Sequence, residues 1–76
     1  MLEVGQIFIR GGIQLCVLDL IDYNSKKYAL ISAEDDKIEF LFYEMIHENG
    51  KYNLNLVSDD ELNCILLEKV EEKINE

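Results

Sequence analysis

Apolar and polar residues alternate along the first three-quarters of the chain with the two-residue period of β-strands. Five such runs, separated by short polar turns, cover residues 6–10, 13–22, 27–33, 38–46 and 52–56. The pairs Gly11-Gly12 and Asn49-Gly50 stand between runs and favour two-residue hairpin turns, because these residues tolerate a positive φ. Connections this short join antiparallel neighbours, so the pattern predicts a five-stranded antiparallel meander.

Two of these runs are apolar on both sides. Within 13–22, Leu15 and Val17 lie on one side and Cys16 and Leu18 on the other, which is typical of a central strand or of one that bends. We therefore expect a curled sheet, either open or closing into a partial barrel. One apolar set of the run 38–46 exceeds what a small core needs, and we interpret it as an apolar partner surface or a homodimer seam: Leu41, Tyr43 and Met45, together with Leu67 further along the chain.

The period changes to that of a helix near residue 58. Apolar residues then recur at helical spacing and form one stripe, consisting of Leu62, Ile65, Leu66, Val70 and Ile74. Ser58 and Glu61 have the spacing of a capping box, which predicts a helix over about 59–75. We expect this helix to pack on one face of the sheet and to provide the main core. The predicted fold is α+β: one domain over residues 1–76, with a curled five-stranded antiparallel meander at about 5–57 and a C-terminal amphipathic helix.

Length and composition limit the range of functions. The chain has 76 residues, 8.9 kDa and 49% hydrophobic residues, enough for one small core but not for a two-domain enzyme or a repeat array. The first residues do not form a secretory signal, and no apolar run approaches the ~20 residues of a membrane span. Cys16 and Cys64 match no metal or redox spacing, so we expect two free, buried thiols rather than a disulfide. These features predict a cytoplasmic protein.

Candidate catalytic chemistry is sparse. His47 is the only histidine, and it has no second histidine or cysteine at ligand spacing, so it is interpreted as a surface residue at a strand end. Acidic pairs such as Asp35-Asp36 and Asp59-Asp60 fall in a turn and at a helix start, where acids have structural roles. We therefore expect no enzymatic activity, no metal and no cofactor.

The distribution of charge is more informative than any motif. Sixteen acidic residues and seven basic ones give a net charge of −9, and all of this excess lies within residues 34–76. Such a charge disfavours direct binding to nucleic acids or to anionic membranes and favours a protein partner with a basic surface. The alternative is a solvated face that keeps a small domain soluble. The candidate partner-binding acids are Glu39, Glu44, Glu48, Asp59, Asp60, Glu68, Glu71 and Glu72.

Several core and turn positions resemble a family of small acidic bacterial proteins of unknown function. The features are Gly5 and Phe8, the segments 17–18, 27–31, 39–40 and 42–43, and the acidic helix start at 58–62. Members of that family have no assigned activity, so the resemblance implies no site residues. The size, charge and layout are also similar in style to phage or mobile-element inhibitors.

Two hypotheses of function follow. The first is a non-catalytic acidic interaction module, an adaptor or regulatory inhibitor, that binds a basic partner protein or a second copy of itself. The second is a nucleic-acid mimic of the anti-CRISPR or anti-restriction type, which would occupy the basic groove of a nucleic-acid-binding enzyme with the acidic face of residues 34–76.

Overall fold

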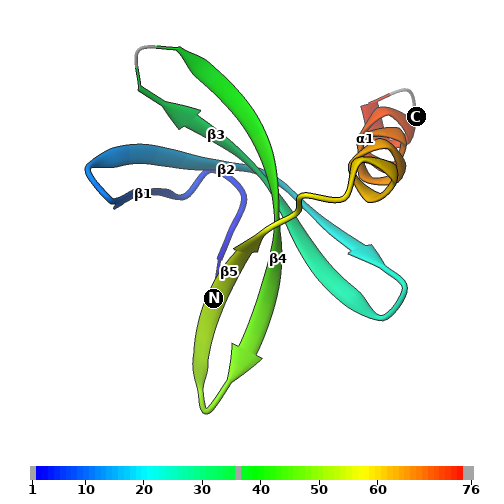
Figure 1. Ribbon diagram of the computed structural model, residues 1–76, viewed down its shortest axis with the longest axis horizontal. Helices are drawn as coiled ribbons and strands as arrows, with labels where there is room; N and C mark the ends of the chain where they lie inside the picture. The colour runs from blue at the N-terminus through cyan, green and yellow to red at the C-terminus, as the bar shows by residue number, and fades with distance from the viewer. Residues whose placement is uncertain (1, 36, 75–76) are drawn as a thin grey trace.

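A computed structural model describes residues 2–35 and 37–74 and contains five strands and one helix (Figure 1). The strands form a single curled antiparallel sheet in the order β1-β2-β3-β4-β5. This confirms the predicted α+β class and the meander topology. The elements are β1 (Ile7–Arg10), β2 (Ile13–Tyr23), β3 (Lys26–Glu34), β4 (Ile38–Glu48), β5 (Lys51–Leu56) and α1 (Asp60–Ile74).

The boundaries lie within two residues of those predicted. The last residue of the predicted helix, Asn75, and one residue of the predicted acidic turn, Asp36, lie outside the described residues. The two predicted hairpin turns have the expected backbone, because Gly12 and Gly50 have φ of 80° and 78°. The turn between β2 and β3 is tighter than its composition suggests: Asn24 and Ser25 both have positive φ, 52° and 65°.

A β-bulge explains why β2 is apolar on both sides. Val17 lies opposite Ile31 of β3 while Asp19 lies opposite Leu30, so Leu18 is an extra residue without a partner. A bulge of this kind bends the strand and increases its twist. The sheet curls so far that Arg10 of β1 donates a hydrogen bond from Nη1 to the Leu54 carbonyl of β5 at 3.5 Å.

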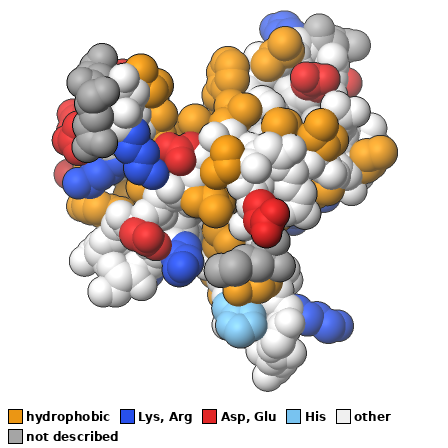
Figure 2. Space-filling view, turned by 180° about the vertical axis from the view of Figure 1, so that it is seen from behind, with side chains coloured by type: hydrophobic (Ala, Val, Ile, Leu, Met, Phe, Trp, Pro, Cys, Tyr) orange, Lys and Arg blue, Asp and Glu red, His pale blue; other side chains and the backbone are white. Residues whose placement is uncertain are grey.

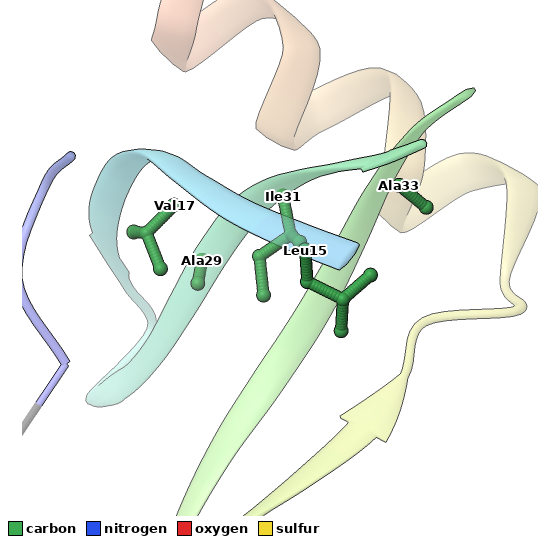
Figure 3. Close-up of a cluster of buried hydrophobic side chains, with 5 residues drawn as sticks. All are labelled: Leu15, Val17, Ala29, Ile31 and Ala33. Carbon is green, nitrogen blue, oxygen red and sulfur yellow. The ribbon is translucent and has the colours of Figure 1, made fainter. Parts of the chain in front are cut away.

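The main core lies inside this curl. Its buried members come from β2 and β3, and Figure 3 shows their side chains on the side of these strands that faces away from α1: Leu15, Val17, Ala29, Ile31 and Ala33. We call this side of the sheet the inner face. The prediction that the helix provides the main core is wrong, because the curl brings inner side chains from all five strands together without it.

A second cluster joins α1 to the opposite, outer face of the sheet. Leu66 and Val70 are buried there with Ile21, Tyr28 and Phe42. Lys73 ties the helix to β2, because its Nζ donates to the Leu20 carbonyl at 2.8 Å and lies 3.3 Å from Asp19 Oδ1.

Ile74 was predicted to continue the apolar stripe, yet it is 75% exposed. The cause is geometric. Residues four apart turn by about 40° around a helix of 3.6 residues per turn, so a stripe with this spacing drifts away from the sheet.

The helix begins one residue later than the predicted capping box requires. Asp59, not Ser58, is the N-cap: its Oδ1 accepts hydrogen bonds from the amides of Glu61 at 2.9 Å and Leu62 at 3.3 Å. Val57, two residues before Asp59, is held by its amide, which donates to the Phe42 carbonyl at 2.9 Å. This contact places Asp59, rather than Ser58, at the position where a side chain reaches the free amides of the first turn.

Candidate functional site

An apolar groove of about 520 Å³ lies between α1 and the first half of β4. In the space-filling view, hydrophobic side chains gather in the notch between the lobe of α1 and the turn that joins β3 to β4 (Figure 2). Its lining is almost entirely apolar and comes from the strands, the linker and the helix: Leu18, Leu30, Phe40, Leu41, Phe42, Val57, Asn63, Cys64 and Leu67.

The groove exists because α1 covers only part of the outer face. On β4, Phe42 is packed under the helix and is 8% exposed, whereas Phe40, two residues earlier on the same face, is 65% exposed. The part of the outer face that the helix covers therefore ends between the rings of Phe42 and Phe40. Leu67 follows the buried Leu66 and turns about 100° away from it, so it forms the helical side of the groove and is 49% exposed.

Further exposed apolar side chains lie on the outer face in two pairs, one on β4 beside the groove and one on β1. Ile7, Cys16, Ser32 and Phe40 lie opposite one another on four neighbouring strands, so their side chains share the outer face. The next row in the same direction runs from Ile9 through the exposed Gln14 and Glu34 to Ile38, so polar residues separate the apolar pair of β1 from that of β4. We define the outer apolar patch as the four large side chains at the corners of these rows, which are 60–73% exposed: Ile7, Ile9, Ile38 and Phe40.

Carboxylates surround the helical side of the groove. Glu71 lies four residues after Leu67 and Asp60 seven residues before it, spacings that place both on the same side of α1 as Leu67. The remaining exposed acids of the helix, Glu61, Glu68 and Glu72, turn further outward. A ligand in the groove would therefore meet an apolar floor with negative charge along its helical wall.

The eight acids predicted as one partner-binding face lie on three surfaces. Asp60, Glu68, Glu71 and Glu72 are exposed on α1, where Asp59 acts as the N-cap. Two others are on the outer face of β4, in the half of the strand that leads to β5. Glu44 lies 3.8 Å from Lys26 Nζ, and Glu48 lies opposite Lys51 in the sheet register. Glu39 is on the inner face of β4 and lines a separate hollow of about 340 Å³ with Asp35 and Lys37.

The three β4 residues predicted as an apolar partner surface are half-buried. Leu41, Tyr43 and Met45 pack against the inner core, and Leu41 also reaches the groove. The exposed apolar residues of β4 are instead those of the alternate set, Ile38 and Phe40. The sequence contained an indication of this, because a 15-residue helix covers only part of a five-stranded sheet and leaves some apolar residues of its outer face uncovered.

The remaining candidate residues are the two cysteines and the histidine. Cys16 and Cys64 are both free, as predicted, but only Cys16 is half-buried, while Cys64 is exposed because it lies on the groove side of α1. His47 is exposed at the end of β4 and stacks on Tyr52 with ring centroids 4.7 Å apart. Within residues 2–35 and 37–74, histidine, cysteine and acidic side chains form no group of three that would hold a metal ion. The single helix of this part is too short and too polar to cross a membrane.

Comparison of the chain with protein-family models, with curated proteins and with solved structures gave no match. Function is therefore inferred from the surface of the molecule alone.

Proposed function

We propose that this protein is a non-catalytic interaction module that binds a partner protein through the groove and the outer apolar patch. The observation that carries the proposal is the apolar groove itself, in which the exposed side chains of Phe40 and Leu67 face each other across an apolar floor. Exposed apolar side chains that adjoin one another on a small domain are typical of binding sites, because water contact with such a surface is unfavourable.

The charge of the molecule supports a basic partner. A net charge of −9 attracts a positively charged surface over a distance and opposes self-association, nucleic acids and anionic membranes. The two free thiols support action in the reducing cytoplasm.

Site-specific photocrosslinking tests this proposal. A photoreactive phenylalanine analogue at position 40 is expected to form an adduct with a partner in a lysate of the source cells, and Leu67→Asp is expected to remove that adduct. The matched control carries the analogue at Leu56, which is 53% exposed on β5 and outside the groove. An adduct that is equally strong from both positions, or that survives Leu67→Asp, contradicts binding in the groove, as does the absence of any adduct from position 40.

A second candidate function is nucleic-acid mimicry, and the carboxylates on the outward side of α1 favour it. If these acids carry the binding, the triple variant Glu61→Gln, Glu68→Gln, Glu72→Gln should lose the partner, while Leu67→Asp should retain it. Binding should then also fall steeply between 50 mM and 300 mM NaCl, since attraction between exposed charges is screened. Partner binding that is insensitive to the triple variant contradicts mimicry and leaves the groove as the binding site.

A further inference from the structure

The groove borders a free edge of the sheet. On one side, β4 pairs with β3 from Ile38 onwards, but on the other side its pairing with β5 begins only at Tyr43. Figure 1 shows the same arrangement: β4 continues past the end of β5 while the chain leaves the sheet toward α1. Among the described strands none pairs with residues 38–41 on this side. Backbone amide and carbonyl groups therefore face outward beside an apolar groove.

From this juxtaposition we infer that the partner contributes an extended peptide segment, which adds to the free edge of β4 at residues 38–41. The inference rests on the proposed function and specifies its ligand. Adding a strand would satisfy the backbone groups of the edge, and every second side chain of the added segment would point into the groove between Phe40 and Leu67.

The other free edges of the sheet are less suited to this role. The outer edge of β5 alternates Asn53 and Asn55 with apolar residues and begins at Lys51, and polar or charged residues of this kind protect an edge against pairing. The outer edge of β1 offers only four residues. The edge at 38–41 is the one that α1 flanks with an apolar wall.

The two faces of β4 specify the sequence of the added segment. Directly opposed residues of neighbouring strands place their side chains on the same face. Residues of the segment on the outer face would meet Phe40 and Leu67 and are therefore apolar. On the inner face the segment would lie beside the hollow lined by Asp35, Lys37 and Glu39, where two carboxylates outnumber one ammonium group, so Lys or Arg is favoured opposite Glu39. The segment thus alternates apolar and basic residues.

A second copy of the chain is a poor occupant of this edge. Antiparallel pairing of two β4 edges would bring the Glu39 carboxylates of both copies to the same face, within a pair of molecules that each carry a net charge of −9. Like charges on neighbouring strands are destabilising. The occupant we propose is a heterologous peptide.

The test uses the absence of tryptophan from the chain. The variant Phe40→Trp places one fluorophore in the groove, and Leu56→Trp places one outside it as a control. The probe is a ten-residue peptide of alternating valine and lysine. We expect a blue shift and a saturable titration for Phe40→Trp and no spectral change for Leu56→Trp.

Four control peptides separate strand addition from other modes of binding. One has the same composition without alternation, one has the composition rearranged as an amphipathic helix, and two carry N-methyl groups on alternate backbone amides, one in each register. The first two are expected to bind at least about tenfold more weakly than the parent peptide. The methylated peptide whose methyl groups face β4 should weaken by a similar factor, because it loses the edge hydrogen bonds while its side chains and charge stay intact, whereas the one whose methyl groups face away should retain the parent affinity. Parent-like affinity of both methylated peptides, or of the helical peptide, would overturn the inference.

A charge exchange tests the predicted pairing at Glu39. Glu39→Lys should weaken the binding of the valine–lysine peptide about tenfold and strengthen the binding of a valine–glutamate peptide. Glu72→Lys, with the same change in net charge, should alter either affinity less than about threefold. Equal effects of both variants would show that the attraction is only that of the whole molecule.

Failure of the inference is distinguishable from failure of the proposed function. If position 40 crosslinks to a partner but N-methylation has no effect on peptide binding, the interaction module stands and strand addition is wrong. If neither the adduct nor peptide binding is seen, both are wrong. A dimer in sedimentation velocity that Glu39→Lys alters would assign the edge to a second copy instead.

Discussion

Ser25 has a backbone conformation that is unfavourable for a residue with a β-carbon. Its φ of 65° lies in the left-handed region, which the β2–β3 turn requires at both central positions. Asparagine tolerates this conformation at Asn24, because its side chain bonds to the local backbone, but serine does so less well. The turn is therefore formed by the pairing of the long strands on either side rather than by its own residues.

Replacement of Ser25 by glycine should stabilise the protein by up to about 1 kcal/mol, since glycine adopts positive φ without steric cost. The reverse experiment is Gly50→Ala in the β4–β5 turn, where φ is 78°, and it should destabilise the protein by a similar amount. Urea unfolding followed by circular dichroism measures both. A loss of stability in Ser25→Gly would contradict the strained-turn interpretation.

The cap of α1 provides a second test at a single residue. Asp59→Ala should cost about 1 kcal/mol of stability, because the amides of Glu61 and Leu62 lose their acceptor. Ser58→Ala is the matched control and should cost less than about 0.5 kcal/mol, the usual range for a surface substitution. Thermal unfolding of both variants decides between the two neighbours, and a larger loss for Ser58→Ala would restore the predicted capping box.

At the level of elements, α1 is held to the sheet by few side chains. Leu66 is fully buried and its neighbour Leu67 is half-exposed in the groove, so two adjacent leucines of one helix have different roles. Leu66→Ala should destabilise the protein by about 2–5 kcal/mol, which is a large fraction of the total stability of so small a domain. Leu67→Ala should change stability by less than about 0.5 kcal/mol.

Denaturant unfolding of these two variants, with Leu66→Met as the volume-conserving control, tests the orientation of the helix. Leu66→Met should retain most of the stability, because methionine fills a similar volume. Equal losses for Leu66→Ala and Leu67→Ala would mean that α1 is rotated from the position described.

The strands were predictable because each follows from the alternation of apolar and polar residues within its own segment. The site depends instead on how far β4 extends past β5 and past the cover of α1. Two-residue alternation located all five strands and the helical stripe located α1. The choice between Ser58 and Asp59 as the cap was not predictable, since both are good N-cap residues and the contact of Val57 with Phe42 decides between them. The open edge of β4 was partly predictable, because its run is longer than that of β5, but the position of α1 beside it was not.

At the level of the whole molecule, the −9 charge and the apolar groove have opposite effects on association. The groove favours contact with any apolar surface, whereas carboxylates on α1 and β4 repel other copies of the chain. The same carboxylates repel one another within a fold whose radius of gyration is 12.4 Å, so they also reduce the stability of the folded state.

This self-repulsion predicts that the melting temperature rises with salt. The Debye length falls from about 30 Å at 10 mM to about 8 Å at 150 mM ionic strength, so added NaCl screens carboxylates that are spread over the molecule. Differential scanning calorimetry from 10 mM to 300 mM NaCl should show this rise, and Glu68→Gln, Glu71→Gln, Glu72→Gln should reduce it to less than about half. If the triple variant shows the same rise as the parent protein, the effect of salt comes from stronger burial of apolar surface, and the acids of α1 have no measurable cost to folding.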